Sequence, residues 1–316
     1  MSELTCSLLT CGYEEEQEYT MDDYTGRLAR WCPGCGDHGV LTAMQRMLEA
    51  EQLKPEDTVF VSGIGCSSRF PHYVKTYGFH GIHGRALPVA TGIRLARPDL
   101  NVFAVMGDGD CCSIGTAHWI HAIRYNVNMV TLLLDNNIYG LTKNQSSPTS
   151  PQGHPSYTQP KGSFLPALNP TAATLGVTNA SFVAQTADWV PSHLFETLRA
   201  AFMHRGFSFV RVLQRCPVWT PKVFEDAVID PKQTELLTHE RGIRDEASAA
   251  IYTNTRSHDP SDLNEAQNLA NEVGVRLGLF YRDESAPRYE ETRRLPVYTA
   301  EEKIEILDKE LDRYAV

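Results

Sequence analysis

Two apolar runs most constrain what this chain can fold into. They extend from Asn101 to Met106 and from Met129 to Leu134, and a segment of helical length separates them. Continuous apolar runs of this length are typical of strands buried on both faces of a parallel sheet. A parallel pair needs a crossover connection, and the intervening segment is long enough for a helix. This stretch therefore predicts a strand–helix–strand unit of an α/β fold.

Polar residues follow each run, Gly107-Asp108-Gly109 after the first and Asn136-Asn137 after the second. Open α/β sheets bind ligands at the carboxyl ends of their strands, where Asp108 and Asn136 would converge. A carboxylate and an amide oxygen suit a hard cation that holds a diphosphate, usually magnesium, and glycines let backbone approach phosphate oxygens. Gly-Asp-Gly alone is more often a simple turn, but the second strand end makes the pair more specific.

Composition excludes several classes of protein. The chain has 316 residues, of which 42% are hydrophobic. It can therefore bury a large core, and it would form one large domain or two smaller ones. Its net charge of −10 argues against nucleic acid as a main partner. We expect no membrane span, because no apolar run reaches about 18 residues. The acidic start, Glu14-Glu15-Glu16, lacks a basic-then-apolar leader, so we expect a cytoplasmic protein.

Eight cysteines need an explanation: Cys6, Cys11, Cys32, Cys35, Cys66, Cys111, Cys112 and Cys216. Disulfides are a poor one in a protein without an export signal. Cys6 and Cys11 have no recognisable partner spacing and are interpreted as free thiols. The Cys32-Pro-Gly-Cys35 turn points two thiolates at one centre, and zinc, a redox dithiol and an iron–sulfur cluster all remain open for it.

Other loops at expected strand ends also carry candidate residues. Cys66 follows a strand at 58–61, and Cys216-Pro217 follows a strand at 207–213. His83 lies between glycine-rich turns and could donate to a phosphate, although a lone histidine is more often structural. The long Ser-, Thr- and Pro-rich segment up to Pro160 comes directly after Asn136, so we interpret it as part of the same pocket.

We expect three parts along the chain. Residues 1–27 are polar and acidic and form an N-terminal arm, and residues 28–225 form the main domain. Residues 226–316 form a mostly helical extension in which charge rises and strands disappear. Helices are expected near 262–277 and 301–314, the second with a capping box formed by Thr299 and Glu302.

The Asp108 and Asn136 arrangement resembles the diphosphate-binding motif of thiamine diphosphate enzymes. In that family the matching positions, Asp108, Asn136 and the backbone carbonyl of Ile138, hold magnesium. Further motifs resemble the β subunits of 2-oxoacid:ferredoxin oxidoreductases, and together they cover about residues 27–225. These are Trp31–Gly36, Gly63–Arg69, Tyr77–His80, Ile82–Gly92, Gly107–Asp110, Asn136–Gly140 and Cys216-Pro217.

This resemblance implies a thiamine diphosphate-binding fold, with a parallel sheet flanked by helices. It implies a [4Fe–4S] cluster on Cys32, Cys35, Cys66 and Cys216, and it puts Arg69 near the substrate carboxylate. Cys111 and Cys112 depart from the run expected after Gly107–Asp110, which affects only local packing. The cofactor-binding residues that it implies are Ile64, Gly65, Ser67, Ser68, His83, Gly84, Gly107, Asp108, Gly109, Asp110, Asn136, Ile138, Gly140 and Leu141.

The implied activity is oxidative decarboxylation of a 2-oxoacid with coenzyme A, with electrons passing through the cluster to ferredoxin. The long C-terminal segment resembles 2-oxoglutarate-type enzymes, so that substrate is favoured. Only one diphosphate half-site is visible, so a separate α subunit is expected to complete the thiamine site and to contact residues 226–316. Two rival interpretations remain, a non-redox thiamine diphosphate decarboxylase or synthase subunit and a zinc-bearing scaffold subunit.

Overall fold

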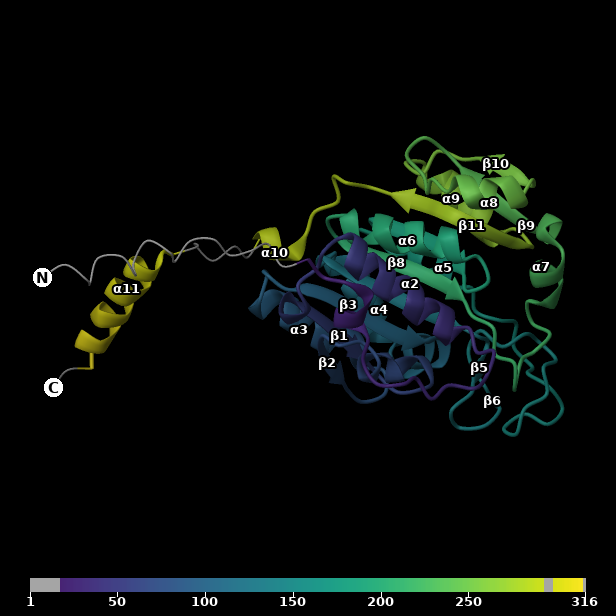
Figure 1. The fold of residues 1–316 in the computed structure, drawn as a ribbon, viewed down its shortest axis with the longest axis horizontal. Coiled ribbons are helices and arrows are strands. Elements are labelled where there is room, and N and C mark those ends of the chain that lie inside the picture. Colours follow the sequence, from purple (N-terminus) through teal and green to yellow (C-terminus); the bar gives the residue numbers. More distant parts are fainter. Residues whose placement is uncertain (1–17, 293–297, 315–316) are drawn as a thin grey trace, which may run out of the picture.

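A single large sheet organises the molecule (Figure 1). The computed structural model describes residues 18–292 and 298–314. Its sheet has nine strands in the order β10-β9-β11-β7-β8-β4-β3-β1-β2. Their bounds are β1 Thr58–Ser62, β2 Tyr77–His80, β3 Asn101–Gly107, β4 Met129–Asp135, β7 Phe182–Ala187, β8 Phe207–Leu213, β9 Thr234–Thr238, β10 Thr255–Ser257 and β11 Val275–Arg282.

The expected central unit is confirmed. Strands β3 and β4 pair in parallel, with Val105 opposite Leu132, and helix α4 (Thr116–Tyr125) connects them. Both strands are apolar and almost wholly buried, as their uninterrupted runs indicated. Since β1 and β8 pair in parallel on either side, the loops after β1, β3, β4 and β8 all leave the same edge of the sheet.

Helices cover both faces of the sheet and enclose two apolar cores (Figure 1). Helix α2 (Asp37–Ala50) and helix α6 (Pro191–Met203) cover one face, with Met44 and Leu198 wholly buried. The other face carries α4 together with α3 (Ala86–Ala96), α5 (Pro170–Leu175) and α9 (Leu263–Asn271). The described part of the expected arm lies against α2, where Gln45 donates to the carbonyl of Tyr24.

The expectation that strands disappear after Phe224 is wrong. Strands β9, β10 and β11 extend the main sheet, and β11 pairs antiparallel with β7, so these three strands run opposite to the other six. The helix expected near 262–277 ends at Asn271, because Glu272 already has an extended backbone and β11 begins at Val275 after a turn at Gly274 with φ 121. The sheet thus continues across the expected boundary at residue 225, and the division into domains stays a prediction.

The capping box of helix α11 (Ala300–Asp312) is confirmed, with Thr299 and Glu302 exchanging hydrogen bonds. In the described ranges, no helix has the length and apolarity that a membrane crossing needs. The expectations for Cys6 and Cys11 lie outside the described residues. The remaining short elements are α1 Met21–Tyr24, η1 Pro55–Asp57, η2 Ser67–His72, η3 Asp110–Ile114, β5 Ile138–Tyr139, β6 Gln145–Ser146, α7 Glu225–Ile229, η4 Pro231–Gln233, α8 Glu246–Ile251 and α10 Tyr289–Thr292.

Candidate active site

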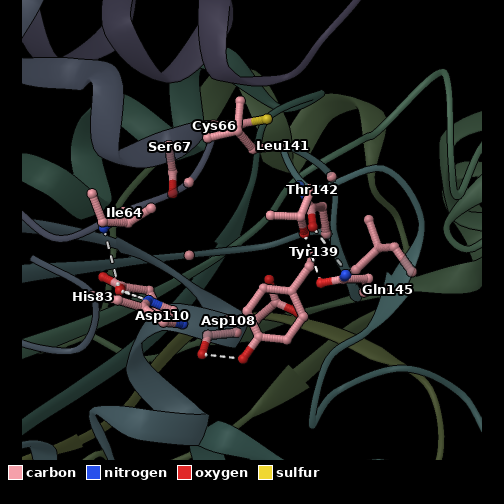
Figure 2. Close-up of a pocket in the computed structure, with 16 residues that line it drawn as sticks. Ile64, Cys66, Ser67, His83, Asp108, Asp110, Tyr139, Leu141, Thr142 and Gln145 are labelled. Carbon is pink, nitrogen blue, oxygen red and sulfur yellow. Dashed lines mark hydrogen bonds and ion pairs between the residues drawn. The ribbon is translucent and has the colours of Figure 1, made fainter. Parts of the chain in front are cut away.

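A pocket of about 430 Å³ lies at the carboxyl edge of the sheet (Figure 2). Its walls come from the loops after β1, β2, β3 and β4, as expected for an open α/β sheet. The residues that line it are Ile64, Gly65, Cys66, Ser67, His83, Gly107, Asp108, Gly109, Asp110, Asn136, Ile138, Tyr139, Gly140, Leu141, Thr142 and Gln145.

The structure brings nearly all the expected cofactor-binding residues together in this pocket. Ser68 and Gly84 are the exceptions, since they lie behind its wall. Ser68 is buried and its carbonyl accepts a hydrogen bond from Ser62 Oγ at 2.6 Å, while the Gly84 N–H donates to Asp110 Oδ1 at 2.7 Å. Arg69 does not line the pocket, and its guanidinium lies over the Tyr73 ring at 5.7 Å.

Asp110 holds two loops of the pocket in place. Its Oδ1 accepts hydrogen bonds from the N–H groups of Ile64, at 3.3 Å, and Gly84. The same oxygen contacts His83 Nδ1, and Figure 2 shows the two side chains turned toward each other. Because Asp110 is only 2% exposed and binds the loops after β1 and β2, its carboxylate positions the pocket walls.

Gly63 must remain glycine for this arrangement to form. A Cβ at Gly63 would overlap the carboxylate of Asp110, whereas a Cβ at Gly92, in helix α3, would meet nothing within 4 Å. We expect Gly63→Ala to weaken thiamine diphosphate binding at least tenfold, because Asp110 must move and release Ile64 and His83. Titration of the cofactor measures this effect, and Gly92→Ala is the matched control that should bind normally. Equal binding by both variants would show that Asp110 can move without consequence.

Asp108 is a buried carboxylate without a cation partner. It is 2% exposed, and burial followed by the negative charge of Asp135 raises the pKa of Asp108 to about 7. The hydroxyl of Thr149 contacts Asp108 Oδ2 at 2.6 Å and Asp135 Oδ1 at 2.8 Å. Arg211 neutralises Asp135 at 2.6 Å, but no arginine or lysine in the described ranges pairs with Asp108. A divalent cation fits this site, because it would offset the uncompensated charge.

Asn136 lies beside this carboxylate with its amide orientation fixed. Its Nδ2 donates to Gln214 Oε1 at 2.7 Å, so its Oδ1 faces the other way and accepts the Ile138 N–H at 3.2 Å. Asn136 is 9% exposed and lines the pocket together with Ile138. Oxygen donors from Asp108 and Asn136 therefore meet at one edge of the sheet, which is the donor set that magnesium prefers.

The cysteines of three separate segments also converge. Gly36, next to Cys35, donates its N–H to the carbonyl of Arg215, next to Cys216, at 3.1 Å. Trp31, next to Cys32, donates its indole N–H to the carbonyl of Cys66 at 2.7 Å. Burial, then the nearby Asp37 carboxylate, and after it Cys216 and Cys32, raise the pKa of Cys66 to about 12.

This cysteine group fits a cluster better than a single ion. Burial, then the nearby Asp37 carboxylate, also raises the pKa of Cys35, so bare thiolates are unfavourable here and positively charged irons would stabilise them. Across residues 18–292 and 298–314, no three His, Cys, Asp or Glu side chains are placed to hold one metal ion. A [4Fe–4S] cluster binds each thiolate on a different iron, so its ligand sulfurs stand further apart.

Cys66 belongs to both the pocket and the cysteine group. It lines the pocket beside Ser67, and Figure 2 shows its sulfur at one end of the cavity near Leu141. A Cβ on Gly140, in the loop after Asn136, would lie 3.7 Å from Cys66 Sγ. The arrangement therefore puts the diphosphate-type pocket and the thiols side by side, as electron transfer between them requires.

Sequence reasoning assigned the segment up to Pro160 to this pocket, but it gave several residues of the site no role of their own. Thr142 and Gln145 line the pocket, and Tyr139, which does so too, donates its hydroxyl to the carbonyl of Gly109 at 2.8 Å. Thr149 and Gln214 lie behind the wall and bind Asp108 and Asn136. The Ser-, Thr- and Pro-rich composition marked the segment that carries Thr149, but no sequence signal indicated Gln214.

Comparison with known proteins agrees with this geometry. Residues 63–212 match the family model described as thiamine pyrophosphate enzyme, C-terminal TPP binding domain. The β subunit of 2-oxoacid:ferredoxin oxidoreductase 1 from Aeropyrum pernix is 37% identical over 277 residues, which cover 85% of this chain and 83% of that protein. This chain belongs to the β subunits of 2-oxoacid:ferredoxin oxidoreductases.

Two further proteins that are similar to this β subunit have 2-oxoglutarate in their names. The 2-oxoglutarate oxidoreductase subunit KorB of Mycobacterium tuberculosis is 51% identical over 196 residues, 62% of this chain but only 52% of that relative. A solved 2-oxoglutarate:ferredoxin oxidoreductase from Magnetococcus marinus, with 2-oxoglutarate, coenzyme A and succinyl-CoA bound, matches with a TM-score of 0.77 and 34% identity, over 93% of this chain and 98% of that one. The expected fold, the thiamine diphosphate-binding domain and the oxidoreductase interpretation are confirmed. The comparisons do not support the two rival interpretations, a non-redox thiamine diphosphate subunit and a zinc-bearing scaffold subunit.

Proposed function

We propose that this β subunit takes part in the oxidative decarboxylation of 2-oxoglutarate. With an α subunit and coenzyme A it forms an acyl-CoA and CO2, passes electrons to ferredoxin, and can run in reverse as a reductive carboxylation. The similarity to the Mycobacterium KorB subunit and to the Magnetococcus enzyme supports this substrate. The observation that carries the proposal is Cys66, which lines the cofactor pocket and is also joined, through its carbonyl, to the Trp31 indole beside Cys32.

The residues of the site divide between two cofactors. Asp108, Asn136 and the backbone carbonyl of Ile138 would hold Mg²⁺ and through it the diphosphate, and Cys32, Cys35, Cys66 and Cys216 would hold a [4Fe–4S] cluster. When bound, thiamine diphosphate supplies the nucleophilic carbon for cleaving the 2-oxoacid, and the cluster accepts electrons. The protein contributes position, because Asp110 and Thr149 hold the loops that shape the pocket.

The surroundings of the pocket support a partner subunit. Large apolar side chains are exposed around its mouth and on the adjoining edge strand β2, including Ile64, Phe79, Ile82 and Leu141, of which Ile82 is 70% exposed. Exposed apolar clusters of this kind mark interaction surfaces. The described residues form one nine-stranded sheet, a small two-stranded sheet of β5 and β6, and one diphosphate-type pocket, so an α subunit would supply the other half of the thiamine site.

The proposal is tested on the complex purified after co-expression with its α subunit. We expect iron, absorbance from thiolate-to-iron transitions, and dye reduction that depends on coenzyme A and is fastest with 2-oxoglutarate among a panel of 2-oxoacids. The β subunit alone should bind iron but show no dye reduction. Full activity of the single chain, or a complex without iron, would refute the proposal.

Arg69 remains a prediction as the residue that binds the substrate carboxylate. It lies two residues after the pocket residue Ser67 and is partly exposed, so its side chain can reorient when substrate binds. We expect Arg69→Ala to raise the apparent KM for the 2-oxoacid at least tenfold, because it removes a charge-assisted hydrogen bond. Steady-state kinetics measure this change, and Arg69→Lys should recover part of it. An unchanged KM would remove Arg69 from this role.

A further inference from the structure

Gln214 connects the two halves of the site. It is the residue after strand β8, two positions before Cys216, and it is only 1% exposed. Its Oε1 accepts a hydrogen bond from Asn136 Nδ2 at 2.7 Å. Its Nε2 donates to Cys35 Sγ at 3.3 Å and to the carbonyl of Arg215 at 2.6 Å. One side-chain amide therefore contacts a candidate magnesium ligand and a candidate cluster ligand.

The partners of Gln214 fix the orientation of its amide. The Arg215 carbonyl can only accept a hydrogen bond, so the Gln214 NH₂ group must face it, and the same group reaches Cys35 Sγ. The Gln214 carbonyl must then face Asn136, and it accepts a hydrogen bond from the Asn136 NH₂ group. This contact turns the Asn136 carbonyl oxygen away from Gln214 and toward the Ile138 N–H, and both Asn136 and Ile138 line the pocket. Reversing either amide would leave two donors or two acceptors in contact.

We propose that Gln214 is a positioning residue for both cofactors: it presents the oxygen of Asn136 to Mg²⁺ and donates a hydrogen bond to the sulfur of Cys35. The inference rests on the proposed function, because it requires both cofactors at this site. A hydrogen bond to a cluster thiolate stabilises the reduced, more negative cluster, and this raises its reduction potential. Gln214 would thus make electron acceptance by the cluster easier and also orient the magnesium ligand.

The test replaces Gln214 by Met in the α–β complex. Met has a similar volume but neither donates an N–H nor accepts through a carbonyl, so both links are lost. We expect the cluster midpoint potential, measured by potentiometric titration with electron paramagnetic resonance, to become more negative by about 59 mV, a tenfold change for one electron. We also expect thiamine diphosphate binding to need about tenfold more Mg²⁺, as is typical when a residue behind a metal ligand is changed. Gln214→Leu, with a different shape, should give the same two shifts.

Thr220→Val is the matched control. Thr220 is also buried and donates its hydroxyl to the main-chain carbonyl of Asn136 at 2.8 Å. Its backbone N–H donates to the carbonyl of Cys216 at 3.3 Å, a bond that Val keeps, and in the described ranges its side chain has no hydrogen bond to a cysteine sulfur. Its substitution should leave the midpoint potential at the wild-type value. A shift as large as that of the Gln214 variants would attribute their effect to general loosening of the site and would overturn the inference.

The outcomes separate this inference from the proposed function. If the wild-type complex binds neither a [4Fe–4S] cluster nor Mg²⁺ with thiamine diphosphate, the proposed function fails. If the wild type binds both and Gln214→Met shows the same potential and the same Mg²⁺ requirement, only the role of Gln214 fails. If a Gln214 variant loses its iron, the Mg²⁺ titration of thiamine diphosphate binding can still be measured. An Mg²⁺ requirement equal to that of the wild type would then overturn the proposed link between the magnesium site and the cluster site.

Discussion

Replacing Cys66 with Ser should remove most of the iron from the α–β complex and reduce its dye reduction to background. Cys66 contributes the sulfur that lies between the pocket and the other cysteines, so its loss removes both a ligand and the contact between the two cofactors. A serine hydroxyl is a much poorer ligand for iron than a thiolate, because its oxygen stays protonated near neutral pH. Iron analysis and visible absorbance measure the first effect, and dye reduction with 2-oxoglutarate measures the second.

Cys112→Ser is the matched control for this experiment. Cys112 is buried, whereas Cys66 is partly buried, and it lies near the pocket in the segment Asp110–Ile114, but it is not one of the four convergent cysteines. Its substitution should leave the iron content unchanged, and Ser at Cys32, Cys35 or Cys216 should lower it as Cys66→Ser does. Full iron content in all four single variants would contradict the cluster assignment, whatever their activity.

The parts of the fold that sequence predicts well are those with local signals. Strands β3 and β4 are long uninterrupted apolar runs, and helix α11 begins with a capping box that involves only Thr299 and Glu302. Strand β11 was missed because it pairs with β7, about ninety residues earlier in the chain, and the pairing contains a bulge between Leu279 and Tyr281. A strand of this kind is stabilised by distant neighbours, and its own residues do not reveal them.

The same distinction explains how much of the site could be predicted. Asp108, Asn136 and Cys66 were found because each follows an apolar strand, and parallel strands bring their carboxyl ends to one edge. Thr149 lies 41 residues from its partner Asp108, and Gln214 lies 179 residues from Cys35. Neither spacing has a pattern that a sequence can show. Asp110 was expected to contact the cofactor, and only the structure reveals that its carboxylate holds two loops.

Replacing Asp108 with Asn should abolish Mg²⁺-dependent binding of thiamine diphosphate, with a loss of at least a hundredfold. Asn has the same shape and can still accept the hydrogen bond of Thr149, so the change removes the charge and little else. A neutral amide is a much weaker ligand for a hard cation than a carboxylate. Calorimetric titration of Mg²⁺ with the cofactor measures the loss, and an excess of chelator should give the wild type the same defect.

Asp108→Asn should weaken cofactor binding, but it should make the metal-free complex more stable. Burial and Asp135 raise the pKa of Asp108 from 3.8 to about 7, so the metal-free folded protein binds more protons than the unfolded chain between about pH 4 and pH 7. Stability is therefore lost as pH rises through this window, and it stays lost above it. Asp108→Asn removes this cost, so its apparent Tm should exceed that of the wild type at pH 8, and the difference should shrink toward pH 5.

An exposed aspartate provides the control for both measurements. Asp99 forms an ion pair with Arg97 at the surface, and the hydrogen bond from Arg97 lowers the pKa of Asp99 to about 2. Asp99→Asn should therefore bind the cofactor normally and gain no stability at pH 8. If Asp108→Asn binds Mg²⁺ and cofactor like the wild type, Asp108 is not the ligand. If it binds neither and is also less stable at pH 8, the loss comes from damage to the fold, because removing an uncompensated buried charge cannot by itself lower the Tm.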